Sequence, residues 1–298
     1  MEVNIYILFW VCIFGLCLGS FYNVVILRTL SNESIVFPPS KCPKCGHKLY
    51  WWHNIPILSY LLLRAKCYFC GEKISIQYPL VEFLTMVLFG FAFIKFGISI
   101  LTLFSFIWIS CLIIMTGTDI KEKVVDCKIS IVMAISALIF WTINSGLKGF
   151  IFSIFGMLLG ALVVEIFART GYLIAGTRAM GEGDTYVAGA LGAMSGFVGI
   201  LLVLLYSLAA AMLFIVPTFL INKFKSGDKL TCILSVLFII SAVILQRFPQ
   251  NLFIIALIII FGIMLAYSIL KGIKQEKNRS YFPYVPALAI GALYFLFI

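Results

Sequence analysis

Charged residues are scarce in this sequence. Asp, Glu, Lys and Arg make up only 11% of its 298 residues, whereas 63% are hydrophobic and the mean hydropathy is +1.12. So few charged side chains cannot coat a soluble globule of this size, and the composition therefore indicates an integral membrane protein. It also excludes a folded basic surface for nucleic acid, so the formal charge of +10 needs another explanation.

Histidine is almost absent as well. His47 and His53 are the only two, and no HExxH sequence occurs, which leaves little support for a catalytic zinc hydrolase. The chain also lacks a Rossmann-type glycine loop and any repeat of fixed period. No βαβ pattern surrounds the cysteines, and this argues against a thioredoxin-like redox role.

Long apolar runs are abundant. Runs of about 20 residues recur along the whole chain and predict membrane-spanning helices. The first run lacks a basic region before it and a small-residue cleavage site after it, so we expect it to remain in the mature protein. The predicted fold is an all-α, polytopic transmembrane helix bundle of about 8–10 spans. The predicted spans are 5–27, 78–95, 98–118, 127–143, 149–168, 198–221, 230–245, 251–270 and 282–298, with a shorter apolar helix at 184–194.

The positive charge follows the loops. If the short helix also crosses the membrane, alternate loops share one face, and this face carries all Lys and Arg except Lys95, Lys148 and Arg247. The positive-inside rule makes this face cytoplasmic, so membrane topology explains the +10 charge. The loops on this face are 28–77, 119–128, 169–183, 222–229 and 271–281.

One polar loop, residues 28–77, contains two CxxC pairs. Each pair is followed by a glycine that permits a tight turn, and the spacing matches a four-thiolate zinc ribbon. Four soft sulfur ligands suit Zn²⁺ and leave no position open for a substrate, so the predicted metal is structural. A reducing cytoplasmic face disfavours disulfides. The predicted ligands are Cys42, Cys45, Cys67 and Cys70.

Four carboxylates lie in or at the ends of apolar runs. Glu82 and Glu165 fall inside predicted spans, while Asp119 and Asp184 lie at the cytoplasmic ends of two of them. A charged side chain in the membrane costs about 2.5–3.5 kcal/mol on insertion scales unless it is paired or faces water. We therefore expect these four residues to be functional or paired.

Asp119 ends an inward-going span and Asp184 begins an outward-going one, so both lie at similar depth. If their helices are neighbours, the two carboxyl groups share a proton, and one acts as a base on water while the other acts as an acid. This is the chemistry of an aspartic protease, and Gly181 and Gly183 would let a substrate backbone approach Asp184. Two alternatives stay open: helix capping by Asp184 and an ion path.

Several motifs occur together and in order, and they resemble those of bacterial type IV prepilin peptidases, which are leader peptidases and N-methyltransferases. The similarity extends over nearly the whole chain. The motifs are GSFYNVVILR at 19–28, the four-cysteine loop with NIPILSYLLLR at 42–71, YPLVE at 78–82, GEGD at 181–184 and YFPYVPALAIGA at 281–292.

The resemblance places the family's two catalytic aspartates on Asp119 and Asp184. It departs from the family pattern at Asp126, which stands where a proline is usual, and at Tyr186, which replaces a lysine. His53 stands where an acidic residue often precedes the NIP sequence. The stretch 223–271 carries two apolar spans that the family usually lacks, and we expect them to form a peripheral hairpin.

The resemblance implies an activity and a location. The substrates would be prepilins and pseudopilins with a basic leader and one hydrophobic helix, cut at the cytoplasmic face of a bacterial inner membrane. Membrane lipid would be the other partner, and no nucleic acid would be bound. The new amino terminus would be methylated with S-adenosylmethionine. The implied division is a methyltransferase region at 1–97, a peptidase core at 98–222, and the extra hairpin with the closing span at 223–298.

The cofactor site and three rival functions stay open. Asn23, Arg28 and Glu82 are candidates for the cofactor site, although a polar network that orients the first two spans explains them equally well. The rivals are a proton-coupled transporter that uses the membrane carboxylates, an inactive zinc scaffold, and a peptidase without the methyl step.

Overall fold

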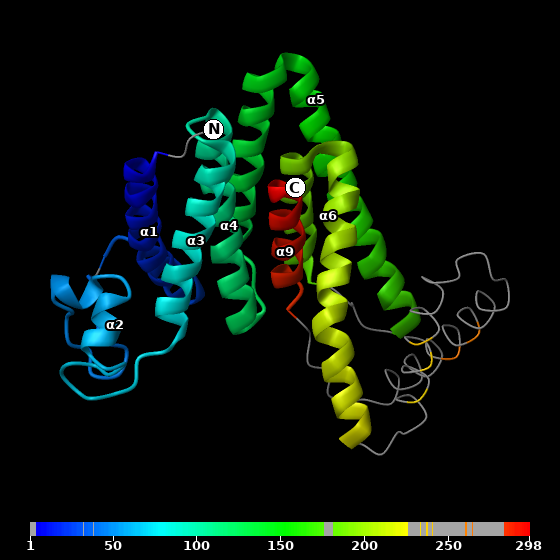
Figure 1. Cartoon of the computed structure of the whole chain (residues 1–298). Helices are drawn as coiled ribbons and strands as arrows, with labels where there is room; N and C mark the ends of the chain where they lie inside the picture. Colours follow the sequence, from blue (N-terminus) through cyan, green and yellow to red (C-terminus); the bar gives the residue numbers. More distant parts are fainter. Residues whose placement is uncertain are drawn as a thin grey trace. The chain divides into compact units, whose positions relative to one another are not determined.

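The protein, seen in a computed structural model, consists of helices joined by loops (Figure 1). The structure describes residues 4–31, 33–37, 39–175, 181–225 and 283–298, together with a few isolated positions. Within these residues no strand occurs beyond two isolated bridges, so the all-α prediction is confirmed. Contacts divide the chain into two compact units, and the site lies in the unit made of Met1–Ile166, Gly181–Ser207 and Phe282–Ile298.

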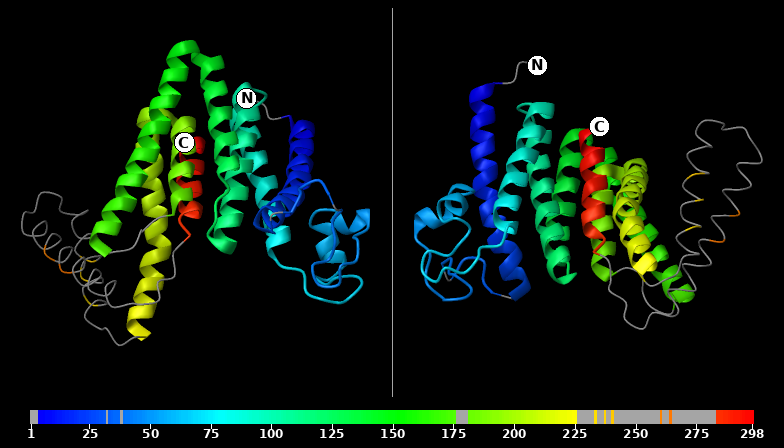
Figure 2. Two further views of the ribbon diagram at one scale, coloured as in Figure 1. Left: turned by 180° about the vertical axis from the view of Figure 1, so that it is seen from behind. Right: turned by 60° about the horizontal axis from the view of Figure 1, so that its bottom comes forward.

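Long apolar helices dominate the described chain. Five of them are long and apolar enough to cross a membrane, and a sixth apolar helix, α9, has 13 residues. In the unit that holds the site, α1, α3 and α4 contact one another, and α9 packs on α4 (Figure 2). These helices are α1 (Ile5–Ser31), α3 (Gln77–Phe96), α4 (Ile100–Glu122), α5 (Cys127–Ala175), α6 (Glu182–Lys225) and α9 (Val285–Phe297).

Two of these helices reverse direction at a glycine. Gly146 in α5 has φ 59° and ψ −142°, and Gly196 in α6 has φ 73° and ψ −176°. Only glycine adopts such angles without steric cost, so each position ends one helical segment and starts another. Figure 1 shows the chain of α5 turning back on itself near its middle. The predicted spans 127–143 and 149–168 are the two halves of α5.

The first half of α6 packs closely on α5. Gly156 of α5 and Gly192 of α6 touch through their backbones, where a Cβ on either would overlap the other residue. Such small residues allow the close approach that favours helix pairing in membranes. The last carbonyls before the reversal at Gly196 also find donors, because Trp141 Nε1 bonds Met194 O at 2.9 Å and Ser153 Oγ bonds Ala193 O at 2.8 Å. The first half of α6 is therefore hydrogen-bonded to α5 up to its last turn.

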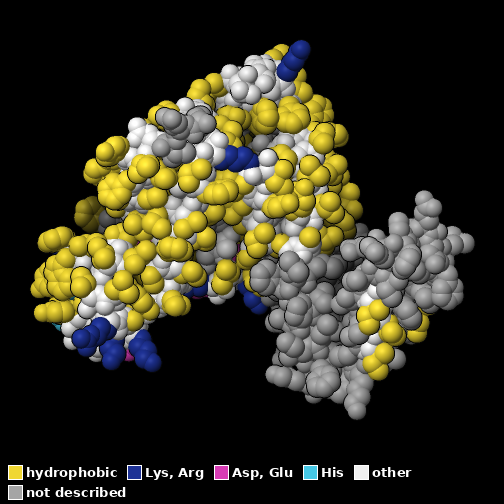
Figure 3. All heavy atoms as spheres, viewed as in Figure 1, with side chains coloured by type: hydrophobic (Ala, Val, Ile, Leu, Met, Phe, Trp, Pro, Cys, Tyr) yellow, Lys and Arg dark blue, Asp and Glu magenta, His cyan; other side chains and the backbone are white. Residues whose placement is uncertain are grey.

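Two hydrophobic clusters form the core, and α4 contributes to both. One joins α4 to α1 and α3 around Phe89 and Ile109, and the other joins α4 to α5, α6 and α9 around Trp108, Leu191 and Leu288. The outer helix faces expose large apolar side chains, as expected of surfaces in contact with lipid (Figure 3). The membrane bundle of the fold prediction agrees with this pattern.

The loop between α1 and α3 contains the four cysteines. It holds two short helices, η1 (Trp51–Asn54) and α2 (Leu58–Leu62), and lies at one end of the neighbouring helices (Figure 1). The predicted spans 230–245 and 251–270, which make up the extra hairpin, lie almost entirely outside the described residues.

Candidate active site

The last turn of α4 carries Asp119, whose side chain is only 4% exposed. Its Oδ2 accepts a hydrogen bond of 3.0 Å from the backbone N–H of Val285, the first residue of α9. The first N–H groups of a helix have no partner within the helix, and the positive end of the helix dipole favours an anion. Asp119 therefore fills a ready-made position for a carboxylate at the start of α9.

Asp184 occupies the first turn of α6 and is 8% exposed. Its Oδ2 accepts the backbone N–H of Gly181 at 3.0 Å. This is half of a capping box in which Asp184 is the third residue of the helix, so Asp184 caps the helix start from within α6 and is not itself the N-cap residue. Capping engages one of its two carboxylate oxygens, and Asp184 still has acceptor capacity for another partner.

The structure brings the two aspartates together from positions 65 residues apart in the chain. Asp119 acts electrostatically on Asp184, so the two carboxyl groups lie within reach of one another's charge. Each of them also faces the N-terminus of a helix, α9 for Asp119 and α6 for Asp184. The two helix dipoles offset part of the repulsion that opposes the approach of two like charges.

Tyr284, directly before α9, also belongs to this site. Its phenol lies within reach of the charge of Asp184, which disfavours a second negative charge there. The phenol therefore keeps its proton at neutral pH beside the two carboxyl groups. Neither Tyr284 nor Val285 was named as a site residue from the sequence. The closing motif at 281–292 was the signal that could have placed them there.

The two glycines next to Asp184 serve different purposes. A Cβ on Gly183 would lie 2.8 Å from Val125 Cβ in the loop between α4 and α5, so this glycine is required for packing. Among the described residues, a Cβ on Gly181 would meet nothing closer than 3.8 Å, at Asp184 Oδ2. The described part of the chain therefore leaves room for a substrate backbone at Gly181 but not at Gly183.

Asp126 has a local structural role. Its Oδ1 accepts the backbone N–H of Lys128 at 2.9 Å, which caps the start of α5. The departure from the family pattern at this position thus coincides with an ordinary helix cap, and Asp119 is the carboxylate that meets Asp184.

The other two membrane carboxylates have separate partners. Glu165 of α5 accepts a 3.2 Å hydrogen bond from the hydroxyl of Thr185, the residue after Asp184. Glu82 of α3 is 6% exposed and accepts the backbone N–H of Ile57, in the four-cysteine loop, at 2.7 Å. Each carboxylate therefore joins two segments that are distant in the chain.

The four cysteines form one cluster. Their sulfur atoms all lie within 4.8 Å of one another, and Cys42 Sγ is 3.9 Å from Cys70 Sγ. A tetrahedral ion with Zn–S bonds of about 2.3 Å would separate its ligands by about 3.8 Å, which agrees with this distance. Gly46 and Gly71 have φ of 73° and 71°, as the predicted tight turns require. The cluster can hold a metal ion.

Backbone N–H groups prepare this cluster for a cation. The N–H groups of Cys70 and then Phe69 point at the sulfur of Cys67 and lower the pKa of its thiol to about 7. At Cys70 the N–H of Glu72 lowers the pKa of the thiol, but burial and the other cysteines outweigh it and raise this pKa to about 12. A thiolate is the form that binds metal, so the turn favours the ligating state at Cys67.

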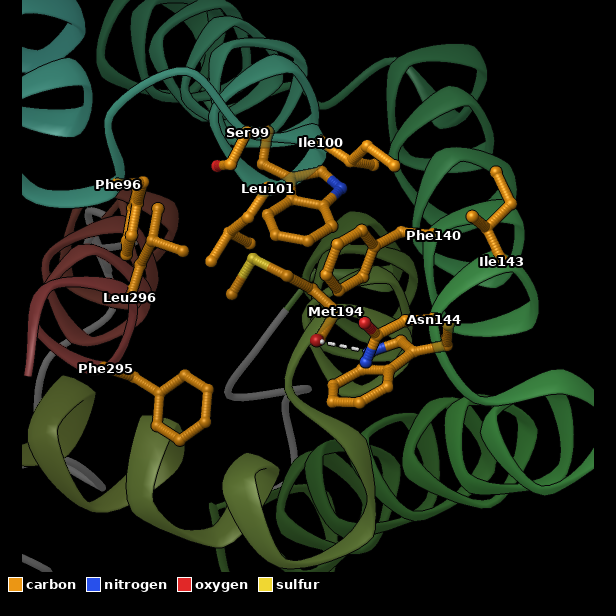
Figure 4. A pocket seen from close by; sticks show the side chains of 12 residues that line it. Phe96, Ser99, Ile100, Leu101, Phe140, Ile143, Asn144, Met194, Phe295 and Leu296 are labelled. Atoms are coloured by element: carbon orange, nitrogen blue, oxygen red, sulfur yellow. Dashed lines mark hydrogen bonds between the residues drawn. The ribbon is translucent and has the colours of Figure 1, made fainter.

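An apolar cavity of about 650 Å³ lies near the start of α4, between Phe96, Leu101, Phe140 and Phe295 (Figure 4). Asp119 is near the other end of this helix, about 28 Å away at 1.5 Å per residue. No carboxylate of the described residues lines the cavity. This cavity is therefore not the site of the aspartate pair.

Two family models match the chain. The bacterial peptidase A24 N-terminal domain matches residues 13–96, and the type IV leader peptidase family matches residues 106–216. A comparison with solved structures finds no match.

Several curated proteins named prepilin leader peptidase/N-methyltransferase are similar to this chain. The protein from Myxococcus xanthus is 38% identical over 65% of this chain and 58% of its own length. The protein from Neisseria gonorrhoeae is 35% identical over 62% of this chain and 72% of its own length. The protein from Xanthomonas campestris pv. campestris is 34% identical over 67% and 77%. The chain thus spans under two thirds of the first relative and more than two thirds of the other two.

Proposed function

The chain belongs to the type IV leader peptidase family, and we propose that it is a membrane aspartic endopeptidase that cuts prepilins and pseudopilins. The observation that carries this proposal is the meeting of Asp119 and Asp184 beside the first residue of α9. Two buried carboxyl groups within reach of one another's charge are the arrangement that divides acid and base roles between them.

In the proposed reaction, one aspartate takes a proton from water while the water oxygen bonds to the scissile carbonyl carbon. The other aspartate gives a proton to the departing amine nitrogen when the C–N bond breaks. The products are the leader with a free carboxylate and the mature pilin with a new amino terminus. Tyr284, with its proton retained, is placed to orient a carboxyl or carbonyl oxygen at this site.

The substrate is proposed to be a chain with a short basic leader and one hydrophobic helix. A helix buries its own backbone groups, so the segment to be cut must be extended when it reaches the aspartates. Gly181 leaves open space beside Asp184 for such a backbone. The basic leader stays on the side of the membrane that carries the Lys- and Arg-rich loops, proposed to be the cytoplasmic face of the inner membrane.

The four-cysteine cluster is proposed to hold a structural Zn²⁺. Four thiolate ligands fill the tetrahedral shell, so the ion has no open position for catalysis and would serve to fix the loop between α1 and α3. Peptide cleavage is assigned to the aspartates alone.

The second proposed activity is methylation of the new amino terminus with S-adenosylmethionine, in keeping with the names of the relatives. When bound, the donor would supply an electrophilic methyl group; the new amine nitrogen would form the N–C bond and lose a proton, and the S–C bond would break to release S-adenosylhomocysteine. We assign the binding of the methyl donor to residues 1–97 and the peptidase activity to residues 98–222. Residues 223–298 contain the extra hairpin and the closing span.

The function is tested by incubating the purified protein in detergent with a prepilin-like peptide, with and without S-adenosylmethionine. Mass spectrometry should find the cleaved leader in both samples and a mature product heavier by one methyl group only when the donor is present. Cleavage without the methyl shift would reduce the proposal to a peptidase. Failure to cleave, combined with proton flux across liposomes, would support a transporter instead.

A further inference from the structure

A second cavity, of about 730 Å³, lies between α1, α3 and the four-cysteine loop. Its size falls in the range of about 300–1,000 Å³ that is usual for small-molecule sites. Its wall combines carboxylates, aromatic rings and lysines, unlike the apolar cavity of Figure 4. Its lining residues include Glu82, His53, Tyr60, Tyr68, Tyr78 and Lys121.

Of the three polar candidates from the sequence, two have structural roles. Asn23 Nδ2 donates to Gly19 O at 3.3 Å and to Tyr78 O at 3.1 Å, which ties α1 to α3. Arg28 Nη1 donates to the carbonyls of Ser34 and Ile35 at 2.9 and 3.0 Å, which fixes the chain after α1. Arg28 also lines the cavity, but its guanidinium is engaged by these two carbonyls; Glu82 is different because it brings a buried carboxyl group to the wall.

Glu82 places a carboxyl group in a wall rich in aromatic rings. One of its oxygens accepts the Ile57 N–H, and a carboxylate keeps acceptor capacity beyond a single bond. The rings of Tyr60, Tyr68 and Tyr78 line the same space, and aromatic faces attract cations. A carboxylate beside aromatic faces is a suitable environment for a positively charged ligand without N–H groups, such as a sulfonium.

His53 supplies an independent sign of a ligand. The side chain is 8% exposed, and its Nδ1 accepts the backbone N–H of Tyr50 at 3.2 Å. The proton of the neutral ring therefore resides on Nε2, which has no hydrogen-bond partner among the described residues. A buried donor without an acceptor is costly, and here it belongs to a side chain in the cavity wall.

The cavity and the aspartate pair lie on two sides of the same helix end. Lys121 lines the cavity and follows Asp119 by two residues, which is a rotation of about 200° around α4. The two side chains therefore leave nearly opposite faces of a helix whose full width is about 10–12 Å. An amino terminus released at the aspartates has only to pass this helix end to reach the cavity.

We infer that this cavity binds the methyl donor, with Glu82 facing the positive sulfonium of S-adenosylmethionine. The inference rests on the proposed function and names the site of its second step. His53 serves the adenosyl part, and the lysines of the wall serve the donor's carboxylate.

The test compares binding of two ligands that differ in charge. S-adenosylmethionine carries the sulfonium, whereas S-adenosylhomocysteine has a neutral thioether, so the charge of Glu82 matters only for the former. Calorimetry on the purified full-length protein should show that E82Q lowers the affinity for S-adenosylmethionine at least about tenfold. The affinity for S-adenosylhomocysteine should change less than about twofold. The amide introduced by E82Q keeps an oxygen that can accept the Ile57 N–H, so the loop contact can persist.

E165Q is the matched control, because Glu165 is also a carboxylate in an apolar helix but does not line this cavity. Its affinities should equal those of the unmodified protein. If E82Q lowers the affinity for both ligands equally, Glu82 has a structural role and the inference is overturned. Unchanged affinity for both ligands, or no binding by the unmodified protein, would also overturn it. Leader cleavage by the same E82Q sample should persist, so the cavity can fail as the donor site while the peptidase proposal stands.

Discussion

Two buried carboxylates in this molecule are held in the same way but have different neighbours. Asp119 and Glu82 each accept one backbone N–H from a segment far along the chain, at 3.0 and 2.7 Å. Asp119 faces a second carboxyl group, Asp184, whereas Glu82 lines a cavity with aromatic rings. A backbone donor allows a carboxylate to be buried, and the next neighbour then decides whether the site suits proton transfer or cation binding.

The strongest way to break this comparison is to remove one member of the pair. D119N or D184N should lower the rate of leader cleavage by about 10²–10⁴-fold, because Asn can neither give nor take the proton. Mass spectrometry of a prepilin-like peptide measures the rate. D126N is the matched control, since this aspartate caps α5 and Asn caps equally well. A D184N protein that cuts at the unmodified rate would show that Asp184 is not catalytic.

Removing a cysteine tests the four-cysteine loop, which borders the cavity of Glu82. C67S should reduce bound zinc from about one ion per chain to almost none, because the closed four-thiolate shell is lost. The measurement is metal analysis of the purified protein by mass spectrometry. C17S, in α1 and outside the cluster, should keep its zinc. Full zinc content in C67S would contradict the four-cysteine site.

A smaller effect should follow from adding one methyl group beside Asp184. G183A places a Cβ against Val125 and should destabilise the protein by about 1–3 kcal/mol and slow cleavage by displacing Asp184. In G181A the added methyl group would meet no described atom closer than 3.8 Å, so this variant should destabilise the protein less than G183A. Thermal unfolding and cleavage rates of both variants, and of G183A with V125A, test this point. The double variant should recover most of the loss, and no recovery would mean that Val125 is not the obstacle.

The smallest effect is expected at Glu165. E165Q should change cleavage by no more than about tenfold, because the hydrogen bond from Thr185 to this carboxylate is partly exposed and such a bond is worth about 0.5–1.5 kcal/mol. The same peptide assay measures it. Loss of activity on the scale of D184N would indicate that Glu165 belongs to a proton path with the aspartates, as a transporter would require.

The sequence predicts much of the membrane part because hydropathy depends on composition alone. The ends of the described spans agree with the prediction to within about four residues, except that α5 continues to Ala175, seven residues beyond the predicted end at 168. Both reversals fall where the sequence placed a gap, at Gly146 and Gly196. The turns of the two CxxC pairs were equally predictable, because the positive φ at Gly46 and Gly71 is a local requirement.

Contacts between distant segments could not be predicted in this way. Nothing in the local sequence shows that Val285 would donate to Asp119, that Val125 would fill the space at Gly183, or that Glu82 would hold Ile57. These contacts depend on how the helices pack. The catalytic roles of Asp119 and Asp184 and the domain limits at 97 and 222 stay predictions.

The most direct measurement of the central claim is a double-mutant cycle on the two aspartates. The kcat/KM of the unmodified protein, D119N, D184N and the double variant would be measured with one prepilin peptide over long incubations. If the pair acts as a unit, each single variant loses nearly the whole contribution and the double variant is no slower. Losses that simply multiply would show that the two carboxylates act independently and would contradict the account.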